Sequence, residues 1–280
     1  MLHFTKSIGN CGATLTAYIH DYEAVMPQME TRPAILICPG GGYAIVSPRE
    51  GEPIALAFMK MGFHAFVLQY TVQGAAAIEE TGKVPEAALG MQPLSEIAEA
   101  MQLIRGKAAE WRVIPDKIAV CGFSAGAHLA GSLGVLYANP ELCAARAATP
   151  AQLRPDAMIL SYPVISEGEF AHVNSFLHLA GEDAPQAVRD QYSLEKQVDA
   201  NTPPAFLWHT VDDAVVPVEN SLLMATALQK NKVPFEMHLF DSGIHGLSLC
   251  TASVNTPNPH ASAWLGLCEE WLKKQFNLAW

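Results

Sequence analysis

The chain has 280 residues, half of them hydrophobic and 16% charged, and its formal net charge at pH 7 is −11. Because it contains no cluster of lysine and arginine, we expect it to bind neither nucleic acid nor an anionic membrane surface. It also contains no uncharged apolar run long enough to cross a bilayer, so its many hydrophobic residues predict a buried parallel sheet. The first six residues lack the apolar stretch of a secretory signal, which favours a cytoplasmic location, and the alternative is a mature chain whose leader has been removed.

Strand and helix patterns alternate along the first half of the chain, which is typical of a mostly parallel sheet with helices on both faces. In chain order they predict an antiparallel edge strand over 14–19, a central strand over 34–38 and a helix over 52–62. A strand over 65–70 and an amphipathic helix over 94–111 follow. A strand over 117–121 and a small-residue helix over 127–133 complete this half. The first of these helices has a proline in its first turn and a glycine at its end, as helices often do. Residues 71–92 are of mixed character and receive no assignment.

The alternation resumes after a stretch of alanines and prolines over 139–155, which predicts a surface connection. The later patterns predict a strand over 157–162, an insertion over 163–202 and a strand over 205–209. They then predict a helix over 219–230, a strand over 235–240 and a final helix over 260–276. Aromatic and leucine residues between Phe170 and Leu179 stand alone in the insertion, so we expect a small lid over a pocket or a homodimer surface. No linker or repeat divides the chain, which predicts one domain over 1–280.

Ser124 lies between two glycines, after the strand over 117–121 and before the helix over 127–133. The pentapeptide Gly122–Gly126 therefore has the Gly-x-Ser-x-Gly pattern in the context that this motif requires. Glycines are needed because the turn from strand to helix is tight and the serine adopts a strained backbone conformation. Ser124 is the predicted nucleophile, and the alternative is a glycine-rich turn with a helix-capping serine.

A serine hydroxyl needs a base within hydrogen-bond reach, and the base needs an anionic partner. Asp213 follows the end of the strand over 205–209, and His245 lies in a glycine-flanked loop after the strand over 235–240. The order nucleophile, acid, base is that of the α/β-hydrolase fold. We therefore predict a catalytic triad of Ser124, Asp213 and His245.

Three other residues compete for these roles. Asp212 is the rival to Asp213, and we interpret it as a turn or capping residue. His209 and His128 are rivals to His245, but the first lies inside a strand and the second inside a helix. Because a single polar residue within an apolar segment is usually held by structural hydrogen bonds, we interpret both as core histidines.

The oxyanion formed by attack on an acyl group must be met by fixed donors. The triple glycine of Pro39–Tyr43 directly follows the strand over 34–38, and glycine lets backbone amides point into a pocket. We predict an oxyanion hole made by the amides of Gly41, Gly42 and Ala125. A phosphate cradle is the alternative, although no lysine followed by serine or threonine comes after the glycines, as it would in a P-loop.

The cysteines and histidines predict no cofactor and no metal site. The six cysteines form no CxxC pair or zinc-like spacing, so we interpret them as reduced thiols. The ten histidines contain no HxxxH or HxH pair.

Several motifs together resemble those of the α/β-hydrolase esterases that include acetyl xylan esterase-like, carbohydrate and feruloyl esterases. They are Pro39–Tyr43 with Arg49–Pro53, Gly122–Leu129, Thr202–Pro204, His209–Pro217 and Gly243–Gly246. The resemblance covers most of residues 13–275 and implies a serine esterase of one domain, often called xylanase- or lipase-like, with its triad at Ser124, Asp213 and His245. Pro39 stands where the lipase-type oxyanion loop carries a histidine, which suits this group.

These observations lead to the hypothesis that the chain hydrolyses a small carboxylic ester, with O-acetyl groups of a sugar or xylo-oligosaccharide as the favoured substrate. Tyr43, Phe123 and Tyr162 are candidates for the wall that contacts substrate, because aromatic faces pack against sugar rings. The alternatives are a peptidase of the prolyl-oligopeptidase type and a catalytically silent hydrolase fold that binds a small molecule. The expected partner is thus a small-molecule ester.

Overall fold

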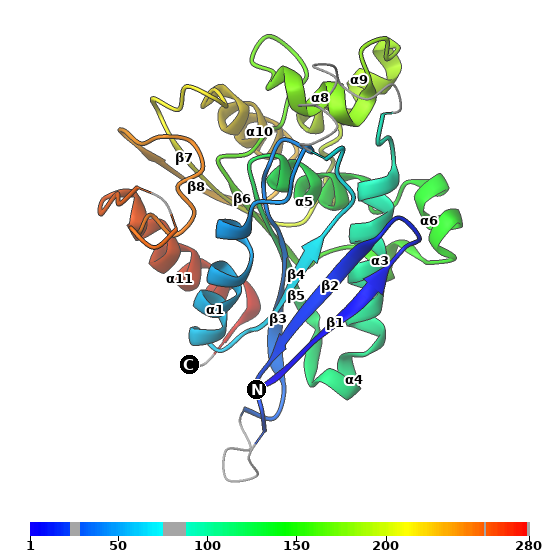
Figure 1. Cartoon of the computed structure of the whole chain (residues 1–280), viewed down its shortest axis with the longest axis vertical. Coiled ribbons are helices and arrows are strands. Elements are labelled where there is room, and N and C mark those ends of the chain that lie inside the picture. The colour runs from blue at the N-terminus through cyan, green and yellow to red at the C-terminus, as the bar shows by residue number, and fades with distance from the viewer. Residues whose placement is uncertain (23–28, 75–87, 255, 279–280) are drawn as a thin grey trace.

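A single eight-stranded sheet forms the centre of the described structure, a computed structural model that describes residues 1–22, 29–74, 88–254 and 256–278. The strand order is β1-β2-β4-β3-β5-β6-β7-β8. β1 pairs antiparallel with β2 and β2 antiparallel with β4, and all later neighbours are parallel (Figure 1). The strands are β1 (Leu2–Ile8), β2 (Ala13–Ile19), β3 (Arg32–Cys38), β4 (His64–Gln69), β5 (Val113–Phe123), β6 (Ala157–Ser161), β7 (Ala205–Thr210) and β8 (Phe235–Phe240).

Helices cover both faces of this sheet. The α-helices of the described residues are α1 (Glu52–Lys60), α3 (Gln92–Gly106), α4 (Ala108–Trp111), α5 (Ala125–Leu136), α6 (Pro140–Arg146), α7 (Pro150–Leu153), α8 (Val173–Ala180), α9 (Gln186–Tyr192), α10 (Glu219–Lys230) and α11 (Trp264–Phe276). α1 and α11 pack on one face, and α3, α5 and α10 pack on the other (Figure 1). The predicted mostly parallel sheet with helices on both faces is confirmed.

The central strand β3 explains why its sequence is a continuous apolar run. Ala34, Leu36 and Cys38 are buried in the core beneath α3 and α5, whereas Ile35 and Ile37 are buried in the core beneath α1 and α11. Since successive side chains of a strand point to opposite faces, a strand covered on both faces needs an apolar residue at every position.

Three expectations about elements were wrong. The strand over 14–19 is antiparallel but is not at the edge, because β1 lies outside it. β1 was missed although Leu2, Phe4 and Ile8 alternate with polar residues, because Lys6 interrupts the alternation and most of the side chains are exposed. The connection over 139–155 contains α6 and α7, and the helix over 94–111 is divided into α3 and α4 at Lys107.

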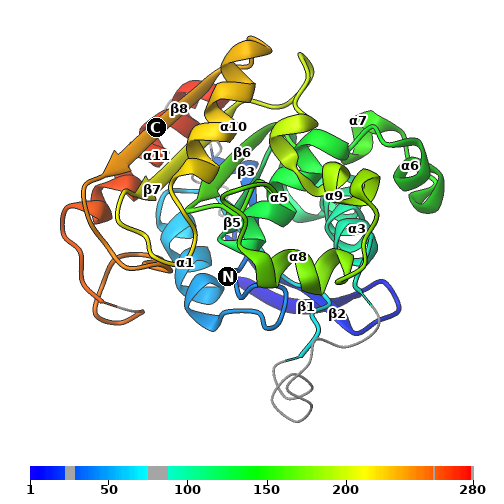
Figure 2. The ribbon, with the colours of Figure 1, turned by 90° about the horizontal axis from the view of Figure 1, so that it is seen from above.

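The parallel strands all end at the same edge of the sheet, and this edge carries the residues of interest. The glycine loop follows β3, Ser124 follows β5, Asp213 lies beyond β7 and His245 lies beyond β8. The segment 163–202 contains α8, α9 and a 3-10 turn (Leu194–Lys196), and α8 and α9 lie at this end of the molecule (Figures 1 and 2). The fold thus brings distant parts of the chain to one place.

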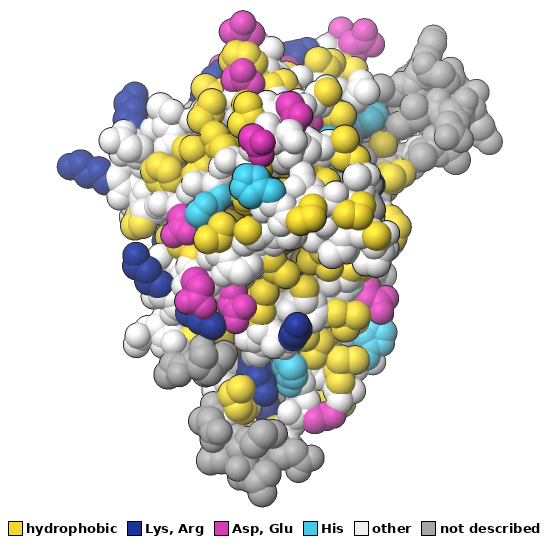
Figure 3. Space-filling view, turned by 90° about the vertical axis from the view of Figure 1, so that its left-hand side faces the viewer, with side chains coloured by type: hydrophobic (Ala, Val, Ile, Leu, Met, Phe, Trp, Pro, Cys, Tyr) yellow, Lys and Arg dark blue, Asp and Glu magenta, His cyan; other side chains and the backbone are white. Residues whose placement is uncertain are grey.

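The surface in Figure 3 mixes hydrophobic and charged side chains, and its lysines and arginines are scattered without forming a patch. Within the described residues, every helix is too short or too polar to span a bilayer.

Candidate active site

Ser124 lies in a sharp turn between β5 and α5 with φ of 54° and ψ of −121°. The flanking glycines are required by close backbone contacts. A Cβ atom on Gly122 would lie 2.2 Å from the carbonyl oxygen of Gly126, and one on Gly126 would lie 2.1 Å from the carbonyl oxygen of Cys38. Any other residue at either position would collide with backbone, so the local sequence determines this turn.

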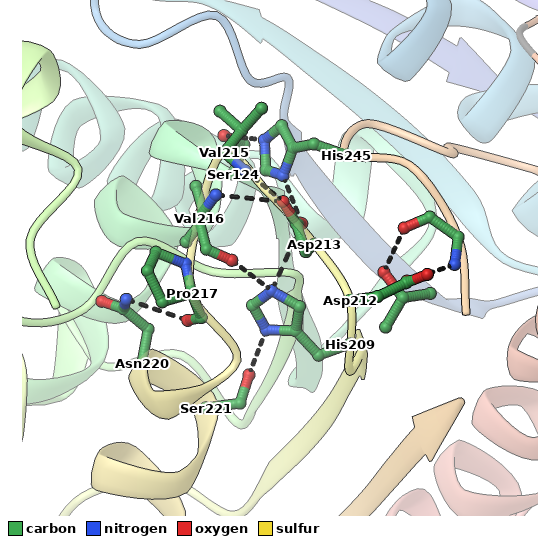
Figure 4. A network of polar contacts seen from close by, with 12 residues as sticks. Ser124, His209, Asp212, Asp213, Val215, Val216, Pro217, Asn220, Ser221 and His245 are labelled. Carbon is green, nitrogen blue, oxygen red and sulfur yellow. Dashed lines mark hydrogen bonds and ion pairs between the residues drawn. The ribbon is translucent and has the colours of Figure 1, made fainter. Parts of the chain in front are cut away.

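The structure brings Ser124, His245 and Asp213 into one hydrogen-bonded chain (Figure 4). His245 Nε2 is 2.8 Å from Ser124 Oγ, and His245 Nδ1 is 2.6 Å from Asp213 Oδ2. Asp212 points elsewhere, since its Oδ1 accepts a hydrogen bond of 2.7 Å from the amide of Gly243. Of the two neighbouring carboxylates, Asp213 contacts the imidazole and Asp212 supports the loop that carries it.

The Asp213 carboxylate is fully buried and fixed on both oxygens. Its Oδ1 accepts from the amides of Val215 and Val216, at 2.9 Å and 3.0 Å. Burial alone would raise the pKa of this carboxyl, but hydrogen bonds from His209 and His245 hold the pKa well below its usual range. Asp213 is therefore an anion at neutral pH and can stabilise a positive charge on His245.

His209 is a second imidazole at the same carboxylate. Its Nε2 lies 3.1 Å from the carbonyl oxygen of Val216 and 3.4 Å from Asp213 Oδ2, and its Nδ1 lies 2.8 Å from Ser221 Oγ (Figure 4). Because a carbonyl oxygen can only accept, Nε2 must carry a proton. His209 thus stands on the far side of the acid from His245.

His128 is held in the core by two hydrogen bonds. Its Nδ1 is 2.8 Å from the Tyr43 hydroxyl and its Nε2 is 2.8 Å from the carbonyl oxygen of Tyr192. Burial lowers the pKa of His128 to about 4, so the ring is neutral at pH 7. Through these two hydrogen bonds, His128 connects Tyr43, next to the triple glycine, to Tyr192 in the segment 163–202.

Gly41 and Gly42 adopt φ values of 128° and 64°, where a side chain would be strained. No hydrogen bond within the described part of the chain uses the amides of Gly41, Gly42 or Ala125. Ala125 is the first residue of α5, and the first amides of a helix have no partner inside it. These three amides are thus available to an oxyanion, and Gly41 and Gly42 line the same cleft as Ser124.

Glu50 was not identified from the sequence and is central to the site. Its Oε2 accepts from the Gly40 amide at 2.8 Å, and its Oε1 accepts from the Tyr162 hydroxyl at 2.6 Å. The Tyr162 hydroxyl in turn accepts from the Ser248 amide at 2.9 Å. One buried carboxylate therefore joins the glycine loop to the loop that carries His245. In the sequence, Glu50 lies within the motif Arg49–Pro53, but nothing in that motif indicates that its carboxylate is buried against the glycine loop.

The Ser124 hydroxyl faces a cleft of about 310 Å³. Its lining consists of Gly41, Gly42, Ala44, Ile45, Ser47, Arg49, Glu50, Ser124, His172, Asn174, His178, Val215, His245 and Gly246. The expected substrate wall is corrected here. Tyr43, Phe123 and Tyr162 are all buried and none of them lines the cleft, because their rings fill the core beneath the loops. The polar side chains from α8 take that place, and the described residues contain no cluster of metal ligands.

The sheet is mostly parallel, the loops after its strands carry a Ser-His-Asp arrangement, and the serine lies in a strained turn. These features define an α/β-hydrolase with a serine nucleophile. Comparison with known proteins places the chain within this class. The chain belongs to the BD-FAE family, whose family model matches residues 24–228. Together with the relatives described next, this match confirms the expected relationship to acetyl xylan esterase-like esterases of the α/β-hydrolase type.

Two relatives and one solved structure are similar over most of the chain. Endo-1,4-beta-xylanase B of Butyrivibrio fibrisolvens is 40% identical over 84% of this chain, and acetylxylan esterase of Xylanibacter ruminicola is 28% identical over 81%. The chain spans only 34% and 43% of the lengths of these two proteins. The crystal structure of an acetyl ester-xyloside bifunctional hydrolase from Caldicellulosiruptor lactoaceticus has a TM-score of 0.77 and 37% identity, and the match covers 94% of this chain and 88% of that one.

Proposed function

We propose that this protein is a serine esterase that hydrolyses small carboxylic esters, and that its substrates include O-acetyl groups on sugars or xylo-oligosaccharides. The observation that carries the proposal is the continuous hydrogen-bonded chain from Ser124 through His245 to a buried, ionised Asp213. The similarity to an acetylxylan esterase and to an acetyl ester-xyloside hydrolase supports the choice of substrate.

In the proposed reaction, His245 Nε2 takes the Ser124 proton while Oγ attacks the ester carbonyl. The Asp213 carboxylate stabilises the imidazolium that forms. His245 then gives the proton to the departing alcohol, which leaves an acyl group on Ser124. Water, activated by the same imidazole, attacks this acyl-enzyme and releases the acid.

The tetrahedral intermediate needs donors for its oxyanion, and the free amides of Gly41, Gly42 and Ala125 are the groups we assign to this role. They are fixed before substrate arrives, so they need no reorganisation during the reaction. The positive end of the α5 dipole adds to the stabilisation, since Ala125 is its first residue.

Labelling with a fluorophosphonate and hydrolysis of p-nitrophenyl acetate test the proposal together. We expect wild-type protein and a Ser253→Ala control to be labelled, and Ser124→Ala to lose both the adduct and at least about 10³-fold in kcat. An unlabelled wild-type protein, or a Ser124→Ala variant with full activity, would contradict it. A panel of acetyl, butyryl and octanoyl esters with acetylated xylo-oligosaccharides then tests the substrate class.

We also propose that the protein works in the cytoplasm. Its six cysteines are all unpaired and four of them are buried, as expected in a reducing compartment. Cell fractionation followed by immunoblotting tests this location, and recovery from the culture medium would contradict it.

A further inference from the structure

Helix α8 and the residue before it bring three polar side chains to the cleft that the proposed chemistry does not use. They are His172, Asn174 and His178, and they lie beside the glycine loop and His245 in the cleft lining. Proton transfer and oxyanion binding are already assigned to other groups. Polar groups in a substrate cleft without a part in the chemistry serve to orient and select the substrate.

The two imidazoles of this group differ in their surroundings. His178 is buried and its Nδ1 is 2.7 Å from the carbonyl oxygen of Gly42, which accepts a hydrogen bond from it. The carbonyl oxygen of His178 accepts from the amide of Leu89. His178 thus holds the glycine loop in place against α8.

His172 is half-buried and has one ring nitrogen to spare. Its Nδ1 is 2.8 Å from Ser175 Oγ, and Nε2 makes no hydrogen bond within the residues that the structure describes. Its Cε1 lies 3.7 Å from the position that a Cβ on Gly42 would occupy. The edge of the ring therefore lies against the glycine whose amide we assign to the oxyanion, so an ester held there has its neighbouring atoms near this ring.

The charge of this ring limits what it can bind. Burial, together with the nearby imidazoles of His245 and His178, lowers the pKa of His172. The ring is neutral at pH 7, and the nitrogens of a neutral imidazole can donate or accept according to the tautomer. Such a group suits a hydroxyl, which also does both, better than it suits a carboxylate or a phosphate.

We propose that His172 is a specificity-determining residue that hydrogen-bonds a free hydroxyl on the alcohol part of the ester, on the carbon next to the acylated one. The inference rests on the esterase function proposed above and deepens it. Partly acylated sugars carry such a hydroxyl, and simple alkyl esters do not. A site built to bind a hydroxyl loses affinity for the analogue that lacks it, because a polar group of the site then remains unpaired.

Two acetate esters of nearly equal size test this directly. 2-Hydroxyethyl acetate has a hydroxyl next to the acylated carbon, and propyl acetate has a methyl group in its place. We expect wild-type protein to prefer the hydroxylated ester, and we expect His172→Ala to lower the ratio of the two kcat/KM values by about three- to tenfold. An unchanged ratio in His172→Ala would overturn the proposal.

Three further variants make the test specific. His172→Gln keeps a donor and an acceptor and should retain most of the ratio, whereas Ser175→Ala frees the ring and should lower the ratio by a smaller factor than His172→Ala. His260→Ala removes an exposed histidine outside the cleft lining and should leave the ratio at the wild-type value. Equal losses in His172→Gln and His172→Ala would overturn the hydrogen-bond role, and the Ser175→Ala result still decides if His172→Ala does not fold.

The failure of this inference can be distinguished from failure of the proposed function. If wild-type protein cleaves neither acetate ester nor an acetylated xylo-oligosaccharide, the esterase proposal itself is wrong. If it cleaves both small esters and the ratio does not respond to His172, only the role of His172 is wrong.

Discussion

Hydrogen bonds from the backbone fix the orientation of the Asp213 carboxylate. Two backbone amides hold Oδ1, which leaves Oδ2 to face His245 and His209. Neither oxygen is free to rotate away without breaking these bonds inside the core. The orientation of His245 therefore depends on a carboxylate that is fixed before substrate arrives, which is the condition for a defined tautomer.

The first prediction concerns the choice between the neighbouring acids. Asp213→Asn should lower kcat on p-nitrophenyl acetate by about 10³- to 10⁴-fold, because the amide would place a donor opposite His245 and favour the wrong tautomer. Asp212→Asn is the matched control, since its amide oxygen can still accept from Gly243 and kcat should stay near the wild-type value. A large loss in Asp212→Asn with an active Asp213→Asn would reverse the assignment.

The second prediction concerns Glu50. Glu50→Ala leaves the Gly40 amide and the Tyr162 hydroxyl without their buried acceptor, so we expect a loss of about 1–3 kcal/mol in the free energy of unfolding. Because both catalytic loops shift, kcat should fall more than KM rises. Glu52→Ala, at the exposed start of α1, should cost less than about 1 kcal/mol. Urea unfolding and steady-state kinetics measure both, and equal behaviour of the two variants would contradict the role of Glu50.

At the scale of elements, the sequence predicted what depends on local patterns. Continuous apolar runs such as 34–38 indicated strands covered on both faces, and the helix over 219–230 has the bounds of α10. β1 was missed because its outer position exposes most of its side chains, and Lys6 interrupts the alternation of Leu2, Phe4 and Ile8 with polar residues. α6 was missed although Asn139 accepts hydrogen bonds from its first amides and a proline follows, which is a start pattern.

The residues of the site also fall into two groups, those that a short sequence motif identifies and those that only the folded structure brings to the site. Ser124, Asp213 and His245 each sit in a short motif after a strand, and the structure brings all three together. Glu50 bonds to the distant Tyr162, and the ring of His172 lies beside the distant Gly42, so no local pattern places either residue at the site. The three aromatic residues expected at the substrate wall are buried, because an apolar ring near a motif fills the core as readily as it lines a pocket.

The third prediction concerns the packing of α5 against β3. Gly126→Ala would place a methyl group 2.1 Å from the carbonyl oxygen of Cys38, which is backbone and cannot move aside. We expect the free energy of unfolding to fall by about 3 kcal/mol or more. Gly266→Ala in the exposed face of α11 meets nothing within 4 Å and should stabilise the protein by about 0.5–1 kcal/mol. Thermal unfolding of the two variants checks this, and a tolerated Gly126→Ala would contradict the close contact.

At the scale of the whole molecule, histidines buried in the fold make stability depend on pH. Burial lowers the pKa of His128 to about 4 and, with nearby charges adding to the effect, that of His64 to about 3. The ordinary value near 6.5 applies once the chain is unfolded. Between these values the unfolded chain binds protons that the folded chain does not, so acid favours unfolding in this window.

The fourth prediction follows from that sign. The contribution of the two neutral rings to the free energy of unfolding is fully present well above pH 6.5 and is lost as the pH falls, by about 1.5 kcal/mol per histidine between pH 6.5 and 5. Urea unfolding at these two pH values measures it, and His128→Gln should reduce the difference by about 1.5 kcal/mol. The carboxyl group of Asp213 acts only at lower pH, because its pKa is depressed. A wild-type stability that does not change between pH 5 and 6.5 would contradict the neutral state of these rings.

The place of α8 in the chain bears on how substrate preference can change. Residues 163–202 leave the sheet at the end of β6 and return at the start of β7, and these two strands are direct neighbours. The segment is therefore a cassette whose exchange can leave the strand register intact, provided that the donor segment keeps the hydrogen bonds that the Val164 amide makes to the Ser124 carbonyl oxygen and that the Tyr192 carbonyl oxygen makes with His128. Chimeras that carry this cassette from a related hydrolase should inherit the alcohol preference of the donor while they keep the acyl-transfer chemistry of the recipient.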